Sequence, residues 1–245
     1  MCAHTSVIQN VKNIEAEYKV KLSDESKRDL FDEPHYHIIG FTHPQMLIIP
    51  QEKPGVLAAS TWGIAPEDKL VEELKTYYKA ARNFGGGINA RSEKAFDHFL
   101  YRESIYTKRC IIPVSAFFEP HDHKGDKYPF VFKPKDKDFL SLAGIYTRID
   151  RKVTFAILTK EASPLFAKIH NKKNRQPVIL SSDQENDWLK DDLDQREIEG
   201  IIRADYDESQ LEYHPVSQDL FHPHTSSDVK DILKKVEYEV LEVDY

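Results

Sequence analysis

The second residue of the chain is a cysteine, and this position makes a particular chemistry available. If Met1 is removed, Cys2 presents an α-amino group and a thiol on adjacent carbon atoms. The amine has a pKa of about 8 and the thiol a pKa of about 8.5, so both are partly nucleophilic near neutral pH. Such an aminothiol condenses with an aldehyde to an imine, which the sulfur closes to a thiazolidine ring. An internal cysteine cannot do this, because its nitrogen is part of an amide. The alternative is that Cys2 is simply a small residue after the initiator.

Other chemical signals in the sequence are weaker. The glycine run 85–87 is not followed by the Gly-Lys-Ser/Thr of a phosphate-binding loop. Cys110 falls within an apolar run, so we expect it to be an inert core thiol. Two His-x-His pairs lack an obvious third ligand, and we interpret them as solvated loop residues, with no metal and no other cofactor expected. These pairs are His121 with His123 and His222 with His224.

The length, composition and net charge of the chain indicate what kind of protein carries Cys2. The chain has 245 residues, 40% of them hydrophobic, which suits one domain over residues 1–245 with a substantial core. The start lacks a signal-peptide pattern, and no apolar run approaches the roughly 20 residues that span a bilayer, so we expect a soluble cytoplasmic protein. The net charge is -7, whereas nucleic-acid-binding domains usually carry a basic surplus. Any contact with DNA should therefore be a focused basic patch.

Helices are expected towards both ends of the chain and strands in its middle. Helical spacing of apolar residues predicts helices over 7–20 and 70–81, and Ser92 is a candidate cap for a third that runs through Leu100. Runs of β-branched and aromatic residues predict the strands of one antiparallel sheet. These runs are 110–118, 128–132, 139–146, 153–158 and 177–180. After a capping box at 182–185 we expect a helix near 194–203, a strand near 211–216, a short helix near 227–234 and a last strand near 237–243. This order predicts an α+β fold.

Short motifs follow one another along the chain. They are Thr-Trp-Gly-Ile-Ala-Pro at 61–66, Asn-Ala-Arg-Ser-Glu at 89–93, Lys-Arg-Cys-Ile-Ile-Pro at 108–113, Phe-Phe-Glu at 117–119, Leu-Ala-Gly-Ile-Tyr at 142–146, Ile-His at 169–170 and Arg-Gln-Pro-Val-Ile-Leu at 175–180. Together with Met1-Cys2, this series resembles the SRAP (SOS-response-associated peptidase) family. The matching family segments are Trp-Gly-Leu-x-Pro, Asn-Ala-Arg-x-Glu, Arg-Arg-Cys-x-x-Pro, Phe-Tyr-Glu-Trp, Leu-Ala-Gly-Leu-Trp and His-Asp-Arg-Met-Pro-Val-Ile-Leu. The resemblance extends to about residue 190.

The resemblance implies a fold and a function. The fold would be a central, barrel-like antiparallel sheet with helices packed around it, and its groove would carry the mature N-terminus. The function would be covalent capture, through Cys2, of the ring-opened aldehyde of an abasic site in single-stranded DNA. The partner would be that DNA, with no membrane and no metal. Since this chemistry requires no dimer, we expect a monomer.

The matched polar residues suit steps of that chemistry. Condensation and ring closure both move protons, so Glu119, at the end of an apolar strand, is the candidate general acid and base. His170 could hydrogen-bond the sugar during ring opening, because a neutral imidazole both gives and accepts a proton. Asn89 could orient the Cys2 amine without protonating it. The structural alternatives are a surface ion pair for Glu119, a helix C-terminal histidine for His170 and a plain turn residue for Asn89.

Three further residues are candidates for contacts with DNA. Arg91 and Arg175 carry planar guanidinium groups that fit phosphate oxygens, although each could instead form a surface salt bridge. Trp62 could stack on a base beside the lesion, or it could be a core aromatic.

The chain departs from the family pattern in places. Ala3-His4 stands where Gly-Arg is usual, and Pro120 follows Glu119 where the family often has tryptophan. Four residues, 171–174, separate His170 from Arg175 where the family has one. These differences concern a basic DNA contact, one wall of the site and the alignment of Arg175.

Three functions are compatible with these residues. The first is covalent capture of abasic sites in the DNA damage response, with possible autoproteolytic and DNA lyase activity. The second is a cysteine-type peptidase, with Cys2 as nucleophile and Glu119 or His170 as base. The third is a non-catalytic binder of single-stranded or modified DNA, whose salt-sensitive binding would survive Cys2→Ser.

Overall fold

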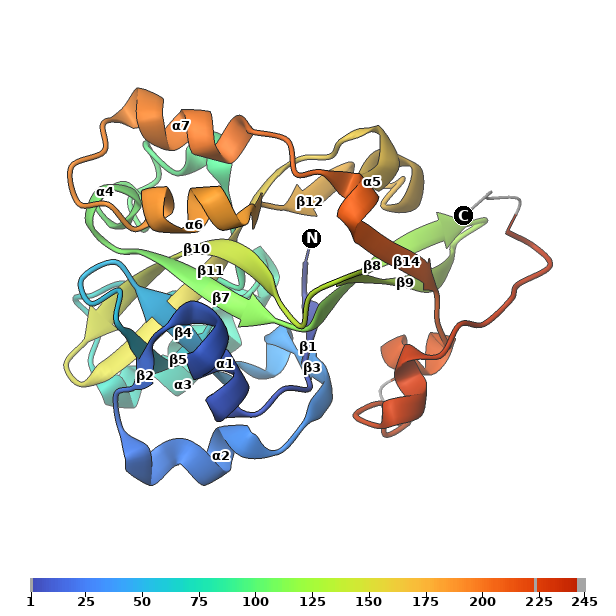
Figure 1. Ribbon diagram of the computed structural model, residues 1–245, viewed down its shortest axis with the longest axis horizontal. Helices are drawn as coiled ribbons and strands as arrows, with labels where there is room; N and C mark the ends of the chain where they lie inside the picture. The colour runs from blue at the N-terminus through green and yellow to red at the C-terminus, as the bar shows by residue number, and fades with distance from the viewer. Residues whose placement is uncertain (1, 223, 242–245) are drawn as a thin grey trace.

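The computed structural model describes residues 2–222 and 224–241. Two sheets carry the fold, and the chain crosses between them several times (Figure 1). The first sheet has five strands in the order β14-β9-β8-β1-β3, and every neighbouring pair is antiparallel. Its strands are β1 (His4–Val7), β3 (His35–Ile39), β8 (Ala116–His123), β9 (Asp126–Pro134) and β14 (Leu211–Pro215).

The second sheet closes into a five-stranded barrel. Its barrel strands are β4 (Gln45–Pro50), β5 (Val56–Trp62), β7 (Arg109–Val114), β10 (Leu140–Ile149) and β11 (Lys152–Glu161). Neighbours are antiparallel until β11 meets β5, where a parallel pair closes the ring. Short strands extend the margins: β2 (Lys21–Leu22), β6 (Asn89–Arg91), β12 (Arg175–Pro177) and β13 (Ile179–Leu180). The α+β fold with a central barrel is thus confirmed, with one parallel closure that the sequence does not predict.

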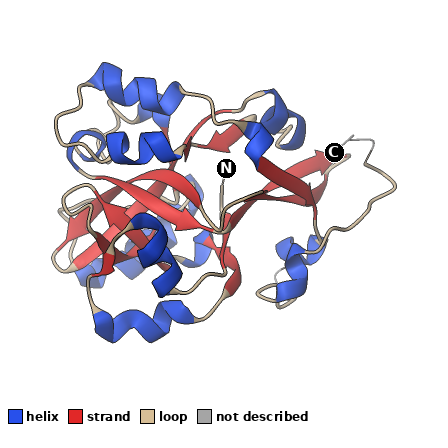
Figure 2. Ribbon diagram, viewed as in Figure 1, coloured by secondary structure: helices blue, strands red, loops and turns tan. Residues whose placement is uncertain are grey.

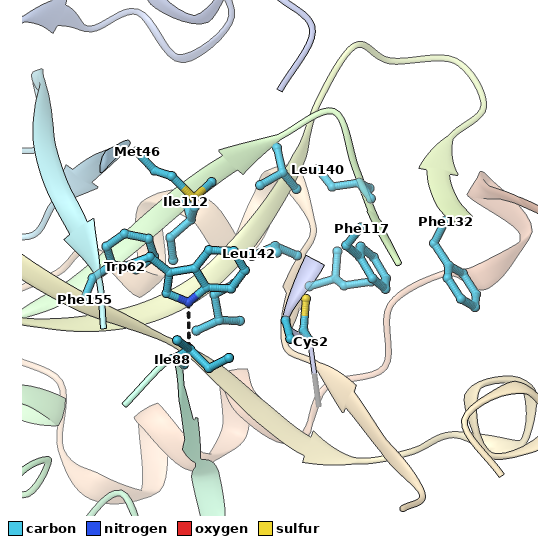
Figure 3. Close-up of a cluster of buried hydrophobic side chains, with 14 of the residues drawn as sticks. Cys2, Met46, Trp62, Ile88, Ile112, Phe117, Phe132, Leu140, Leu142 and Phe155 are labelled. Carbon is cyan, nitrogen blue, oxygen red and sulfur yellow. Dashed lines mark hydrogen bonds between the residues drawn. The ribbon is translucent and has the colours of Figure 1, made fainter. Parts of the chain in front are cut away.

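The alternation of side chains along the barrel strands builds two separate cores. One set packs together as a cluster that includes Met46, Ile48, Trp62, Ile112 and Phe155 (Figure 3). The neighbouring positions on the same strands, such as 47, 49, 111 and 156, form a second cluster with residues of the surrounding helices. Because both faces of these strands are covered, their sequences read as continuous apolar runs.

Helices surround the barrel on several sides (Figure 2). They are α1 (Val11–Tyr18), α2 (Arg28–Asp32), α3 (Leu74–Ala81), α4 (Ser104–Thr107), α5 (Pro164–Ile169), α6 (Ser182–Trp188) and α7 (Gln195–Arg203). No helix in the described part of the chain is long and apolar enough to cross a membrane.

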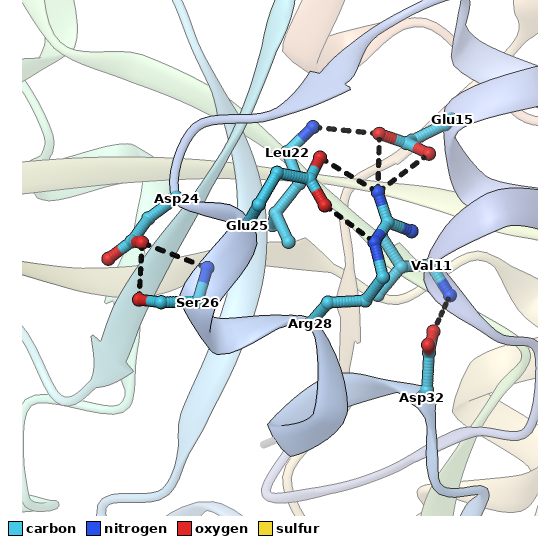
Figure 4. A network of polar contacts seen from close by, with 8 residues as sticks. All are labelled: Val11, Glu15, Leu22, Asp24, Glu25, Ser26, Arg28 and Asp32. Carbon is cyan, nitrogen blue, oxygen red and sulfur yellow. Dashed lines mark hydrogen bonds and ion pairs between the residues drawn. The ribbon is translucent and has the colours of Figure 1, made fainter.

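A polar network fixes the two N-terminal helices to the loop between them (Figure 4). The buried Glu15 carboxylate accepts from the backbone N–H of Leu22 at 2.9 Å and pairs with Arg28 at 3.2 Å. The carboxylate of Asp32 accepts from the N–H of Val11, the first residue of α1. Since that N–H has no partner within its own helix, the contact satisfies a hydrogen-bond donor that would otherwise be unpaired.

Several predicted elements differ from the structure. The helix predicted over 7–20 begins only at Val11, because residues 4–7 form β1 between β3 and β8. The strand predicted over 110–118 is divided at Ser115, where the chain passes from the barrel to the five-stranded sheet. The helix predicted from Ser92 to Leu100 is absent, since a single 3-10 turn and further turns occupy residues 92–100.

Two differences concern the C-terminal half. The capping box lies one residue earlier than predicted, with Ser181 as N-cap and Gln184 as its reciprocal partner. The strand predicted near 237–243 is absent over 237–241, which form a turn and coil, and its remainder lies outside the described residues.

A C-terminal segment, residues 216–222 and 224–241, covers the outer face of the five-stranded sheet (Figure 1). Its apolar side chains Val216, Leu220 and Ile232 pack on Phe118 and Val131 of the sheet. Asp228 fastens the segment to β3 by accepting from the backbone N–H groups of residues 36 and 37.

Candidate active site

Cys2 lies two residues before the start of β1, with its side chain inside the interior cluster (Figure 3). It is fully buried, at 0% exposure. Burial raises the pKa of the thiol well above its ordinary value, and the nearby Glu119 carboxylate raises it further. The sulfur is therefore held as a neutral thiol that needs a base before it can react.

Glu119 and His170 form a buried pair beside Cys2. Glu119 lies in β8, and β1 pairs with this strand through His4 opposite Phe118, so the register brings Cys2 towards Glu119. The Nδ1 of His170 lies 3.0 Å from a carboxylate oxygen of Glu119, and both side chains are buried. The sequence predicts these residues together, and the structure places them in contact.

The backbone around His170 fixes its tautomer. The imidazole Nδ1 lies 2.9 Å from the backbone carbonyl oxygen of Arg175, which can only accept a hydrogen bond. Nδ1 therefore carries the hydrogen, and in the neutral ring Nε2 is the nitrogen with the lone pair. This arrangement leaves the ring able to accept a proton at Nε2.

The four residues between His170 and Arg175 form a turn that returns the chain to the site. Helix α5 ends at Ile169 with His170 as its C-cap, and the N–H of Asn174 donates to the carbonyl of His170 at 3.0 Å. Asn174 adopts a left-handed conformation with φ 49°, which asparagine tolerates better than most residues. Arg175 then begins β12 beside β11, so the longer connection preserves the placement of both motif residues.

Asn89 holds the backbone of Cys2 from the other side. Its side-chain amide donates to the carbonyl oxygen of Cys2 at 2.8 Å. The sequence predicts a contact with the amine, whereas the observed contact is with the carbonyl. The Oδ1 of Asn89 is buried and has no hydrogen-bond partner among the described residues. That oxygen is an acceptor suited to an N–H donor.

The glycine run before Asn89 is structural. Gly87 has φ +68°, and a Cβ there would lie 2.6 Å from the carbonyl oxygen of Ile64. Only glycine fits this close approach, because any side chain would collide with the backbone. The turn leads directly into β6, which pairs with β11 and so fixes the position of Asn89.

Trp62 lies in the core of the barrel, which is the alternative that the sequence allows, and not on a surface where a base could stack on it. Its side chain is fully buried in the barrel, where it stacks on Phe155. The indole N–H donates to the carbonyl of Ile88 at 2.8 Å, next to Asn89. Trp62 is therefore a core residue that positions the β6 strand.

Arg175 is also placed differently from the prediction. It is buried, and its guanidinium pairs with Glu93 at 2.5 Å and donates to the backbone carbonyl of Thr159 at 2.6 Å. These contacts occupy both terminal nitrogens of the guanidinium group, which would otherwise bind a phosphate. Arg175 instead joins the Asn-Ala-Arg-Ser-Glu motif to β11.

A smaller hollow of about 290 Å³ opens on the Asn89 side of Cys2. Arg91 is exposed here, as expected for a residue that contacts DNA, and Lys94 adds a second positive charge. Phe84, which sequence reasoning missed, is 90% exposed at its edge. Its only signal in the sequence is an aromatic residue directly before a glycine run.

A larger hollow of about 580 Å³ opens on the His170 side of Cys2. Ala3, His4 and His170 line it next to the reaction centre. Its rim carries three lysines, Lys127, Lys172 and Lys173. Cys2 thus lies between two hollows, since its neighbours along the chain line one and its partner Asn89 lines the other.

The histidine pairs set aside in the sequence are placed as follows. His121 is not a solvated loop residue, because it is buried in β8 and contacts the carbonyl of Ile169. His222 and His224 are exposed, and Cys110 is a buried core thiol as predicted. Within residues 2–222 and 224–241, no three histidine, cysteine, aspartate or glutamate side chains come together as metal ligands would.

The fold and these contacts define a class of α+β protein with a closed barrel, in which a buried cysteine just before the N-terminal strand lies near a buried glutamate–histidine pair. The sequence profile of the SOS response associated peptidase (SRAP) family matches residues 1–223. The chain belongs to this family.

Individual relatives agree with this assignment. The abasic site processing protein YoaM of Bacillus subtilis is 30% identical over 172 residues, which cover 68% of this chain and 70% of the relative. The abasic site processing protein YoqW of the same organism is 29% identical over 173 residues, which cover 68% of this chain and 71% of the relative. A crystal structure of a protein from Bacteroides thetaiotaomicron superposes with a TM-score of 0.84 at 28% identity, covering 96% of this chain and all of that one.

Proposed function

We propose that this protein processes abasic sites in DNA by capturing them covalently through Cys2. The observation that carries the proposal is the convergence of Cys2, Asn89, Glu119 and His170, which come from four distant parts of the sequence. The names of the Bacillus relatives, which are abasic site processing proteins, support the choice of substrate.

The reaction begins when the free α-amine of Cys2 adds to the C1′ aldehyde of the ring-opened sugar. The carbinolamine loses water and becomes an imine, and the Cys2 sulfur then adds to the imine carbon while its proton passes to the nitrogen. The product is a thiazolidine that joins protein and DNA, and one water molecule is released overall. The reaction requires a chain that begins at Cys2.

The buried pair supplies the proton transfers of this sequence. Glu119 lies beside the thiol and can accept its proton during ring closure, because a carboxylate at this position is within the electrostatic reach of the sulfur. His170 carries its hydrogen on Nδ1 towards Glu119 and the Arg175 carbonyl, so Nε2 can accept a proton from the sugar. The acceptor Oδ1 of Asn89 can orient the amine.

The two hollows favour a single strand as the substrate. Each combines cationic side chains with aromatic rings, which is how proteins hold unpaired bases and their phosphates. Phe84 and Arg91 provide this combination in the smaller hollow. A duplex would keep its bases stacked on one another and leave the exposed Phe84 ring without a partner.

The cysteine peptidase in the family name has less support. A cysteine peptidase reacts through a thiolate, whereas burial and Glu119 both raise the pKa of the Cys2 thiol. Ring closure onto an imine needs the proton only at that step, when Glu119 can take it.

The test is intact-protein mass spectrometry after incubation with a single-stranded oligonucleotide that holds one abasic site. A chain that begins at Cys2 should gain the mass of the oligonucleotide minus one water and keep it under denaturing conditions. Cys2→Ser and Cys2→Ala should form no stable adduct. Cys110→Ser is the matched control, since it removes the other thiol and should leave the adduct intact. A wild-type chain that begins at Cys2 and forms no adduct would overturn the proposal.

A further inference from the structure

The C-terminal segment supplies one wall of the larger hollow. Leu220, Phe221 and His222 line it from this segment, while Ile39 and Phe41 line it from the end of β3 and the turn that follows. These lining residues lie within residues 1–223, the part of the chain that matches the family. Val216 and Leu220 hold the segment on the sheet together with Asp228 and Ile232, which lie beyond residue 223.

The hollow has the chemistry of a nucleotide site. Phe41 is 38% exposed and Phe221 half-buried, so two aromatic rings border an apolar interior. Its rim holds three lysines against one aspartate, Asp122, which pairs with Lys172 at 3.0 Å. Its volume of about 580 Å³ falls within the range of about 300–1,000 Å³ typical of small-ligand pockets.

The wall beside the reaction centre is uncharged. His4 shares a hydrogen bond with His37, with 2.8 Å between Nδ1 and Nε2, and their rings stack. Burial, and then the neighbouring His37, lower the pKa of His4 to about 3. The edge of Phe221 packs against the His4 ring. This part of the hollow is therefore a neutral aromatic surface, and the positive charge is confined to the lysine rim.

We infer that the larger hollow binds the nucleobase next to the abasic site, with Phe221 and Phe41 as the stacking rings and Lys173 on a backbone phosphate. This inference rests on the proposed function. The nucleotide is supplied by the captured strand itself, because Ala3, His4 and His170 belong both to the hollow and to the surroundings of Cys2. A base attached one link away from the captured sugar is therefore presented to the aromatic rings.

The protein should therefore bind an abasic site more tightly when the nucleotide on one particular side of the lesion still carries its base. Stacking on an aromatic side chain contributes about 1–3 kcal/mol per base, which corresponds to a change in affinity of about 5- to 160-fold. Removing that base should therefore weaken DNA binding by about tenfold. Removing the base on the other side of the lesion should not cause this loss, because that base does not enter the larger hollow.

The test measures non-covalent affinity with Cys2→Ala and oligonucleotides that contain a tetrahydrofuran analogue of the abasic site. A second tetrahydrofuran replaces the neighbouring nucleoside on one side or the other, which removes a base and keeps every phosphate. We expect about a tenfold loss for one side. Adding Phe221→Leu should abolish most of this difference. Phe99→Leu is the matched control, since Phe99 is exposed but lines neither hollow, and should keep it.

Each outcome decides the inference. Equal affinities for all the oligonucleotides, or the same loss in Phe221→Leu as in its parent, would overturn it. If Phe221→Leu fails to fold, Phe41→Leu on the β3 side of the hollow takes its place with the same expected result. Capture by the wild-type chain, measured separately by mass spectrometry, tests the proposed function on its own. An intact capture reaction without dependence on the neighbouring base would refute only the present inference.

Discussion

Replacing Glu119 with glutamine removes a charge from the interior while keeping the size and shape of the side chain. The amide oxygen of glutamine can still accept the hydrogen that His170 directs at this position from 3.0 Å, so the local fold should persist. The amide cannot take up or release a proton in the reaction. Glu119→Gln therefore separates proton transfer from architecture.

The size of the effect follows from the role of the carboxyl group. A positioned general acid or base contributes about 10²–10⁴ in rate, equivalent to about 3–5 kcal/mol of activation free energy. We expect adduct formation by Glu119→Gln to slow by about that factor. Loss of the negative charge should also lower the pKa of the Cys2 thiol, because Glu119 is one of the two causes that raise it.

The assay is a single-turnover time course with abasic oligonucleotide in excess, quenched and resolved under denaturing conditions. Affinity for the tetrahydrofuran oligonucleotide is measured in parallel and should stay within about twofold of wild type, since Glu119 is fully buried. Glu15→Gln is the control for removing a buried carboxylate elsewhere, because Glu15 pairs with Arg28 on the N-terminal helices. A capture rate within about threefold of wild type, or an equal loss of binding and capture, would refute the proton-transfer role.

Three further outcomes are expected. Arg91→Ala should weaken non-covalent DNA binding and reduce the slope of log K against log[salt] by about one, because Arg91 is an exposed cation beside the smaller hollow. Trp62→Phe should lower the free energy of unfolding by about 2 kcal/mol in a urea titration, through loss of the bond to Ile88 and of core volume, with DNA affinity unchanged. Burial lowers the pKa of His4 to about 3 and that of His37 to about 4, so the unfolded chain binds more protons below its ordinary histidine pKa of 6.5. The free energy of unfolding should therefore fall by on the order of 6 kcal/mol as pH drops from neutral to about 4, and less in His37→Gln.

Each of these has an outcome that contradicts it. An unchanged salt slope would assign Arg91 a structural role. A loss of DNA affinity in a stably folded Trp62→Phe variant would mean that the indole contacts DNA. Identical pH profiles for wild type and His37→Gln would remove the histidine pair as the source of acid sensitivity.

Three of the five barrel strands, β7, β10 and β11, can be predicted from the sequence, because they are apolar runs with turn residues between them. The short strands β1 and β3 cannot, since they contain histidine, serine and threonine and become strands only by pairing with each other and with β8. Their stability comes from contacts distant in sequence, which local propensity does not record.

The candidate site also divides into residues that the sequence identifies and contacts that only the fold creates. Glu119 and His170 are identified from motifs, but only the fold brings them to 3.0 Å from each other. The role of Trp62 depends on which face of β5 it occupies, and the sequence does not predict β5. The pairing of Arg175 with Glu93 joins two motifs that are 82 residues apart, so each arginine or glutamate alone reads as a surface charge.

The position of β1 between two other strands also affects the order of events during synthesis. One partner strand, β3, is made soon after β1, but His4 pairs on its other side with Phe118, which is 114 residues further along the chain. At a translation rate of about 5–20 residues per second, roughly 6–20 s pass before that partner exists. Throughout this interval the first residues cannot be enclosed in the sheet. Enzymes that trim a nascent chain therefore meet an open substrate, and the sheet forms around the N-terminal strand only afterwards.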